Sequence, residues 1–178
     1  QEARDLVYAN IGEYVYSEND ETMPLVVGNL LRDRKLNLAI AESCTGGFVS
    51  SLLTDYAGAS EFLRESVVTY ANEAKVSRLK VDPLLIEQYG AVSEPVAVAM
   101  ARGVKQHLGC DYGLAVTGIA GPGGGSPDKP VGTVHLAIAH SNEIWHKMYR
   151  FNAERATFKQ IVAYTLLGRL RRLILGLK

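Results

Sequence analysis

The sequence predicts a three-layer α/β/α domain. From residue 22 onward, short runs of strand composition alternate with segments whose apolar residues recur at helical spacing. The chain has 178 residues, 47% of them apolar, which is enough to build one sizeable core. We therefore expect a sheet that is covered by helices on both faces.

The chain divides at about residue 22. Residues 1–21 are polar and are predicted to form a short helix and a linker, while residues 22–178 form the domain itself. Thr22 is a predicted N-cap, because Met23-Pro24 and a helical apolar pattern follow it.

Two strand-to-helix junctions follow. The first strand, at 36–41, runs into the turn Ser43–Gly47 and then directly into a helix. The second, at 66–70, precedes Asn72, which is a predicted cap for the next helix. Such junctions place the unpaired backbone N–H groups of a helix start next to the end of a strand.

The second half of the chain is predicted to complete the sheet and its cover. Asp82-Pro83 opens a helix that Gly90 closes, and Ser93-Glu94-Pro95 opens another. The remaining predicted elements are strands at 112–116, 131–139 and 144–151 and a long C-terminal helix carrying Phe158, Val162, Leu166 and Leu170 on its buried side.

Composition excludes several functions. Nineteen basic and nineteen acidic residues balance, so no net field favours a nucleic acid or an anionic membrane. No apolar run approaches the roughly 20 residues of a membrane span. The cysteines, Cys44 and Cys110, have no metal-ligand spacing and form no disulfide framework. We expect a cytoplasmic protein without a bound metal.

Ser43 is the first candidate for chemistry. It follows a strand and precedes a helix, where free N–H groups and the helix dipole favour an attacking hydroxyl or a developing oxyanion. Thr45 adds a hydroxyl, and Gly46 and Gly47 allow close approach of a ligand. The backbone N–H groups at the Thr45–Gly47 helix start are predicted to hold the oxyanion. The alternative is that Ser43 only caps the helix. Cys44 is a competing nucleophile, although a small buried thiol is the simpler interpretation.

Lys75 and Tyr70 lie at the second junction. A cation in the first turn of a helix opposes the dipole, and such exceptions occur where function requires them. A lysine with a lowered pKa can serve as a base for serine. The alternative is a solvated lysine on an amphipathic helix. Ser77-Arg78-Leu79-Lys80 also fits S-x-x-K, but neither S-D-N nor K-T-G follows it, so we treat it as a chance match.

The segment from Gly118 to Pro127 is rich in glycine and joins two predicted strands. Its unhindered amides could surround a phosphate, with Thr117 before the loop and Lys129 beyond it. It matches neither common nucleotide-binding glycine motif, so an ordinary surface connection remains an alternative. Arg155 is either a phosphate ligand or a surface charge.

Taken together, four ordered motifs resemble those of the CinA carboxy-terminal domain family. They are AESCTGG (41–47), YANEAK (70–75), GAVS (90–93) and AVTGIAGPGGG (115–125). The resemblance covers about residues 22 to 176. It is imperfect near Arg155, where the family often has Gly-Asp-Arg and this chain has Ala153-Glu154-Arg155.

The resemblance implies a nicotinamide mononucleotide amidase of pyridine-nucleotide salvage, with a mixed-sheet fold, no cofactor and a homodimeric state. It implies Ser43 as nucleophile, Lys75 as general base and Tyr70 as a supporting hydroxyl, with Thr117 and Arg155 contacting substrate. The predicted substrate-binding set is Thr45, Gly46, Gly47, Thr117, Gly118, Gly123, Gly124 and Arg155.

Two other functions remain open. The chain could be a non-catalytic nucleotide-binding or assembly module of a larger protein of this type. It could also be a serine hydrolase for another amide or ester. The strand–turn–helix elbow at Ser43–Gly47 suits a nucleophilic serine, but it does not itself identify nicotinamide as the substrate.

Overall fold

Five strands form one sheet in the order β2-β1-β3-β4-β5 in the computed structural model, which describes residues 1–177. Strand β1 (Leu38–Glu42) runs parallel to β2 (Leu63–Val68) and β3 (Tyr112–Gly118). Strands β4 (Thr133–His140) and β5 (Glu143–Arg150) continue the sheet in antiparallel fashion. The sheet is therefore mixed, as the resemblance implies.

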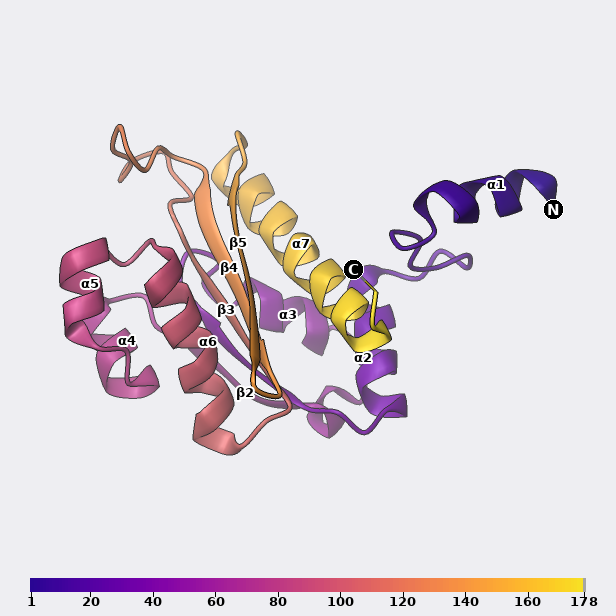
Figure 1. Ribbon diagram of the computed structural model, residues 1–178, viewed down its shortest axis with the longest axis horizontal. Helices are drawn as coiled ribbons and strands as arrows, with labels where there is room; N and C mark the ends of the chain where they lie inside the picture. The colour runs from indigo at the N-terminus through magenta and orange to yellow at the C-terminus, as the bar shows by residue number, and fades with distance from the viewer. Residues whose placement is uncertain (178) are drawn as a thin grey trace.

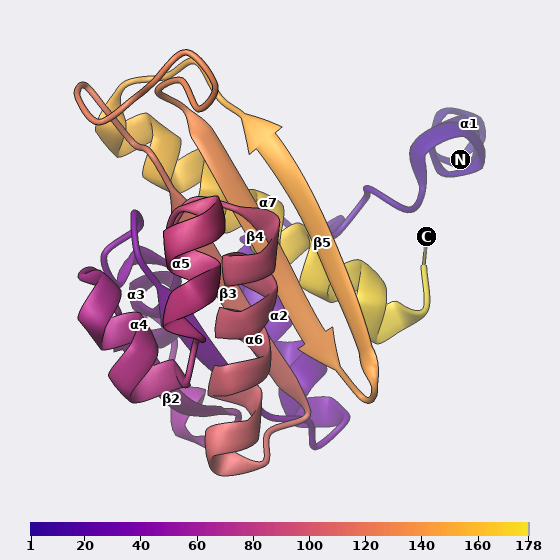
Figure 2. The same cartoon turned by 60° about the vertical axis from the view of Figure 1, so that its left-hand side comes forward.

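Helices cover both faces of this sheet (Figure 1). Figure 2 shows helices α4 (Asn72–Leu79), α5 (Pro83–Tyr89) and α6 (Glu94–Leu108) on one face. On the other face lie α2 (Met23–Asp33), α3 (Phe48–Thr54) and α7 (Arg155–Leu175), and a 3₁₀ turn (Ala59–Glu61) precedes β2. The predicted three-layer architecture is confirmed.

Two apolar cores follow from the alternation of side chains along the strands. In β1, Leu38 and Ile40 pack into the core beneath α2, α3 and α7, whereas Ala39 and Ala41 face α6. The small alanines let α6 approach the sheet closely. The end of β1 is thus fixed from both sides.

The predicted helix starts are only partly correct. Thr22 Oγ1 accepts from Leu25 N at 3.5 Å, and Asp82 Oδ1 accepts from Leu84 N at 2.9 Å, so both residues are caps. The prediction for Asn72 is wrong, because Ala71 is the N-cap of α4 and Asn72 is already helical. Ser93 is the residue before α6, but its hydroxyl donates to Gly90 O instead.

The N-terminal segment is joined to α7. Helix α1 (Glu2–Ile11) stands clear of the three layers (Figure 1). Arg171, which is largely buried, donates to the backbone oxygens of Glu13 and Val15, and the Arg172 guanidinium lies 4.9 Å from the centre of the Tyr14 ring. The linker is therefore held at the C-terminal half of α7.

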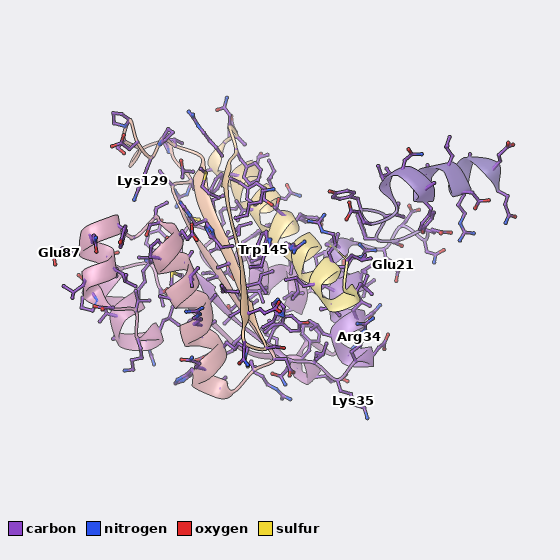
Figure 3. The ribbon with its side chains drawn as sticks, viewed as in Figure 1. Glu21, Arg34, Lys35, Glu87, Lys129 and Trp145 are labelled. Carbon is purple, nitrogen blue, oxygen red and sulfur yellow. The ribbon has the colours of Figure 1, made fainter. Side chains whose placement is uncertain are left out.

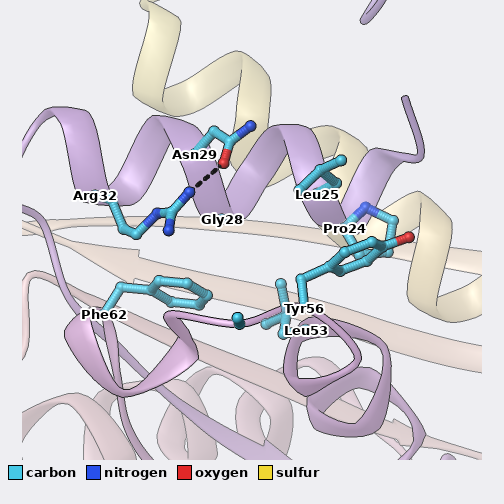
Figure 4. Close-up of a pocket in the computed structure, with 9 residues that line it drawn as sticks. Pro24, Leu25, Gly28, Asn29, Arg32, Leu53, Tyr56 and Phe62 are labelled. Atoms are coloured by element: carbon cyan, nitrogen blue, oxygen red, sulfur yellow. Dashed lines mark hydrogen bonds between the residues drawn. The ribbon is translucent and has the colours of Figure 1, made fainter. Parts of the chain in front are cut away.

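One apolar hollow between α2 and α3 can be set aside as a ligand site. Figure 4 shows it, with Arg32 Nη2 donating to Asn29 Oδ1 at 2.6 Å along one wall. Its volume of about 10 Å³ is enough for no more than a single water. Across residues 1–177, moreover, no helix is both long and apolar enough to cross a bilayer.

Candidate active site

A cavity of about 270 Å³ opens where the parallel strands β1 and β3 end. In open α/β sheets, this carboxyl edge is the usual place for a ligand. The residues that line the cavity are Ser43, Cys44, Tyr70, Asn72, Lys75, Ala91, Val92, Thr117, Gly118, Ile119, Ala120, Gly121, Gly123, Gly124 and Arg155. All four sequence motifs, and Arg155, thus contribute directly to its walls.

Ser43 and Lys75 meet inside this cavity. Lys75 comes from α4, its side chain is only 1% exposed, and its Nζ lies 3.4 Å from Ser43 Oγ. Desolvation by burial holds the pKa of Lys75 below its ordinary value of 10.5. The alternative of a solvated surface lysine is wrong.

Two backbone carbonyls fix the direction of the amine. Lys75 Nζ donates to Thr69 O at 2.8 Å and to Tyr70 O at 3.2 Å. A neutral amine has two N–H bonds and one lone pair, so when both protons point to these carbonyls the lone pair is left for the Ser43 hydroxyl. The arrangement suits a base that removes the serine proton.

The elbow after Ser43 differs from its predicted form. Helix α3 begins only at Phe48, its N-cap is Gly47, and no side chain of the N-cap closes it. The interpretation of Ser43 as that cap is therefore wrong. Gly46 and Gly47 adopt φ angles of +63° and +93°, a left-handed region that glycine enters without strain.

Glu42 supplies the missing cap from the strand. Its fully buried carboxylate accepts from the backbone N–H groups of Gly47, Val49 and Ser50 at 2.9–3.1 Å, and from the Ser50 hydroxyl at 3.0 Å. A buried anion at the start of α3 also interacts favourably with the positive end of the helix dipole. The backbone N–H groups of Gly47, Val49 and Ser50 at the start of α3 are consequently not free to bind a ligand.

The predicted oxyanion site at Thr45–Gly47 must therefore be corrected. Gly47 N–H donates to Glu42 Oε2, and Gly46 N–H donates to Ser43 O at 3.1 Å. Thr45 is fully buried, and none of the three residues lines the cavity, so their predicted contact with substrate is absent from this geometry. In the elbow, Cys44 is the residue after Ser43 that still faces the cavity.

Tyr70 and Arg155 form a bridge across the cavity mouth. Arg155 Nη2 donates to the Tyr70 hydroxyl at 2.9 Å, and Nη1 donates to Gly121 O at 2.9 Å. The Tyr70 ring is 60% exposed, and within residues 1–177 no hydrogen bond joins its hydroxyl to Ser43. Geometry thus favours Lys75 over Tyr70 as the partner of the serine.

The glycine loop forms the opposite wall. Gly118, Gly123 and Gly124 line the cavity as predicted, and Thr117 Oγ1 donates to Ala91 O at 2.8 Å. Lys129 lies elsewhere, because its Nζ donates to Tyr89 O at the end of α5 (Figure 3). Lys129 therefore anchors the loop, and Arg155 is the cation that faces the cavity.

The family model of the CinA C-terminal domain matches residues 20–174. The chain belongs to the CinA family. A CinA-like protein from Geobacter sulfurreducens is 49% identical over 170 residues, which cover 96% of this chain but 41% of the relative. Another from Chlorobaculum tepidum is 54% identical over 135 residues, covering 76% of this chain and 32% of that protein. The chain thus spans less than half the length of these curated relatives.

Solved structures of the CinA family share the fold. The competence/damage inducible protein CihA from Agrobacterium tumefaciens superposes with a TM-score of 0.83 at 36% identity, covering 89% of this chain and 98% of that one. A CinA superfamily protein from Escherichia coli gives 0.81 at 31% identity, covering 92% and 98% respectively.

Several residues of this CinA domain were missed or underrated by sequence reasoning. Cys44 lines the cavity, but burial raises the pKa of its thiol to about 12, so it is not available as a thiolate. Glu42 and Asn72 both lie within the quoted motifs. Their positions in those motifs alone did not indicate a role in the chemistry of the site. Across residues 1–177, no group of three or more metal-ligating side chains occurs.

Proposed function

We propose that this CinA domain is an amidase that hydrolyses nicotinamide mononucleotide to nicotinic acid mononucleotide and ammonia. The observation that carries the proposal is the buried Lys75 amine, directed at Ser43 by two carbonyls within a cavity that is also lined by the glycine loop and Arg155. The family resemblance supplies the substrate class. Cavity geometry supports Ser43 as the nucleophile and Lys75 as the base.

In the first half of the reaction, Ser43 Oγ attacks the carboxamide carbon while its proton passes to Lys75 Nζ. The new C–O bond pushes charge onto the carboxamide oxygen, and we assign the N–H of Cys44, which lines the cavity, as a donor to it. Lys75 then gives its proton to the nitrogen, the C–N bond breaks, and ammonia leaves. Water activated by the same amine hydrolyses the acyl-serine.

Arg155 and the glycine loop are the proposed site for the ribose 5′-phosphate. Arg155 is the cation that lines the cavity mouth beside Gly121, and the loop backbone offers amides nearby. Without substrate, Arg155 is held by Tyr70 and Gly121, so phosphate binding would exchange neutral acceptors for a charged one.

Replacing Arg155 by Ala should raise the KM for the mononucleotide by about 10- to 100-fold, the value of a hydrogen bond to a charged group. For the unphosphorylated riboside, KM should stay within a few-fold because the phosphate is missing. Steady-state kinetics on both substrates checks this, with Arg150→Ala at the exposed end of β5 as control. Equal losses on both substrates would contradict the phosphate assignment.

Release of ammonia from nicotinamide mononucleotide by the purified chain, beside Ser43→Ala, tests the function itself. We expect release by the wild type and none above background from the variant. Persistent release would move the nucleophile elsewhere. No release from the wild type, together with tight mononucleotide binding by both proteins, would favour a binding module, and turnover of other amides or esters alone would favour a different hydrolase.

A further inference from the structure

The elbow offers fewer oxyanion donors than a serine amidase usually presents. Gly46 N–H and Gly47 N–H are bonded to Ser43 O and Glu42 Oε2, and Glu42 also takes the N–H groups of Val49 and Ser50. Cys44 is then the elbow residue that can turn its N–H toward the cavity. Tetrahedral intermediates of acyl transfer are commonly held by more than one preorganised donor.

Asn72 lies on the same side of the cavity as Lys75 and carries an amide donor. It is the first residue of α4 and lies three positions before Lys75, so the two side chains share one face of the helix. Both residues line the same cavity as Ser43. Asn72 therefore lies in the wall of the cavity that holds the nucleophile and its base.

Several other polar side chains of the cavity already have hydrogen-bond partners. Thr117 Oγ1 donates to Ala91 O, and Arg155 is shared between Tyr70 and Gly121. Lys75 donates to two carbonyls. The carboxamide of Asn72, by contrast, forms no hydrogen bond with any of residues 1–177, and the residue is exposed. Its donors are free to turn toward a ligand.

We propose that Asn72 is a catalytic residue whose Nδ2 donates to the oxyanion formed on the substrate carboxamide. The inference rests on the proposed function. When the Ser43 oxygen bonds to the carboxamide carbon, the carbonyl π electrons move to oxygen and the serine proton moves to Lys75. Asn72 Nδ2 and Cys44 N–H then share that negative charge. A neutral donor does this without adding a second cation beside Lys75, which would depress its basicity further.

Two substitutions at Asn72 test the donor. Asn72→Ala removes it, and Asn72→Asp keeps the shape but sets a carboxylate against the oxyanion. We expect kcat for mononucleotide hydrolysis to fall by about 100-fold or more in both, with KM within a few-fold, because the contact strengthens in the transition state. Asn142→Ala, in the exposed β4–β5 turn, should be unaffected.

A reaction that does not need the natural substrate separates this proposal from the function. A fluorophosphonate probe phosphonylates an activated serine through a similarly charged transition state, and intact-mass spectrometry follows its rate. Slower labelling of Ser43 in both Asn72 variants, with thermal midpoints near that of the wild type, supports the donor role even if the mononucleotide is not hydrolysed. Labelling at the wild-type rate, or a loss confined to KM, overturns it.

Discussion

Lys75→Met is expected to lower ammonia release by at least about 100-fold, because general-base catalysis typically contributes 10²–10⁴. Met matches the length of the buried lysine stem but has no lone pair to receive the Ser43 proton. In the wild type, kcat/KM should rise with pH through the pKa of Lys75, which burial places below its ordinary 10.5. That rise should be absent from the residual activity of the variant.

The same substitution should change how stability depends on pH. Between the lowered pKa of folded Lys75 and 10.5, the unfolded chain binds the proton that the folded chain lacks. The free energy of unfolding of the wild type therefore rises with pH in that window, by up to about 1.4 kcal/mol per pH unit. Below the folded pKa both states carry the proton, and the penalty of the buried cation is fully present.

Urea unfolding at several pH values, with Lys147→Met on β5 as the exposed control, measures this effect. The difference in unfolding free energy between wild type and Lys75→Met should shift in favour of the wild type as pH rises. A difference that does not change with pH would mean that Lys75 titrates alike in both states, and the proposed neutral base would be lost with it.

Glu42→Gln should be the most destabilising single change near the site. The carboxylate accepts four hydrogen bonds in a fully buried position, and an amide would turn an NH₂ group toward donors of α3. Leaving buried N–H groups without acceptors costs about 1–3 kcal/mol each, so we expect a loss of about 3 kcal/mol or more. Ammonia release should fall as well, because the elbow loses its anchor.

Chemical denaturation of Glu42→Gln beside Glu87→Gln checks the prediction. Glu87 is exposed on α5 (Figure 3), so its neutralisation should change the unfolding free energy by no more than about 0.5 kcal/mol. A Glu42 variant as stable as the Glu87 variant would show that the N-terminus of α3 does not depend on the carboxylate.

The sequence predicted the elements and the meeting of Ser43 with Lys75 because these depend on patterns of short range. Strand-to-helix junctions can be recognised locally, and parallel strands bring their carboxyl ends to one edge of a sheet. Lys75 was conspicuous because its charge opposes the helix dipole. The structure adds two features that make Lys75 suitable as a base. They are the burial of its side chain and the two carbonyls of Thr69 and Tyr70, directly after β2.

Other site features depended on long-range geometry that no local pattern encodes. A Glu at the end of a buried strand gives no sign that it will cap a helix five residues later. That cap takes the predicted oxyanion donor of Gly47, and the predicted donor of Gly46 bonds to Ser43 O instead. Likewise, Tyr70 was predicted beside the serine, but Arg155, which is distant in sequence, draws its hydroxyl toward the cavity mouth. Gly46 and Gly47 in the elbow allow positive φ angles, whereas the sequence had predicted close contact with a ligand.

Helix α7 carries Arg155, which lines the cavity, and Arg171, which holds the N-terminal linker, near its opposite ends. Arg155 lies in its first turn and Arg171 near its end, about 24 Å apart at 1.5 Å per residue. An affinity tag or sensor surface attached at Gln1 would therefore meet the protein far from the cavity mouth (Figure 1). Immobilisation through that end should leave small molecules free to diffuse in and out, which makes it the natural orientation for binding measurements on this domain.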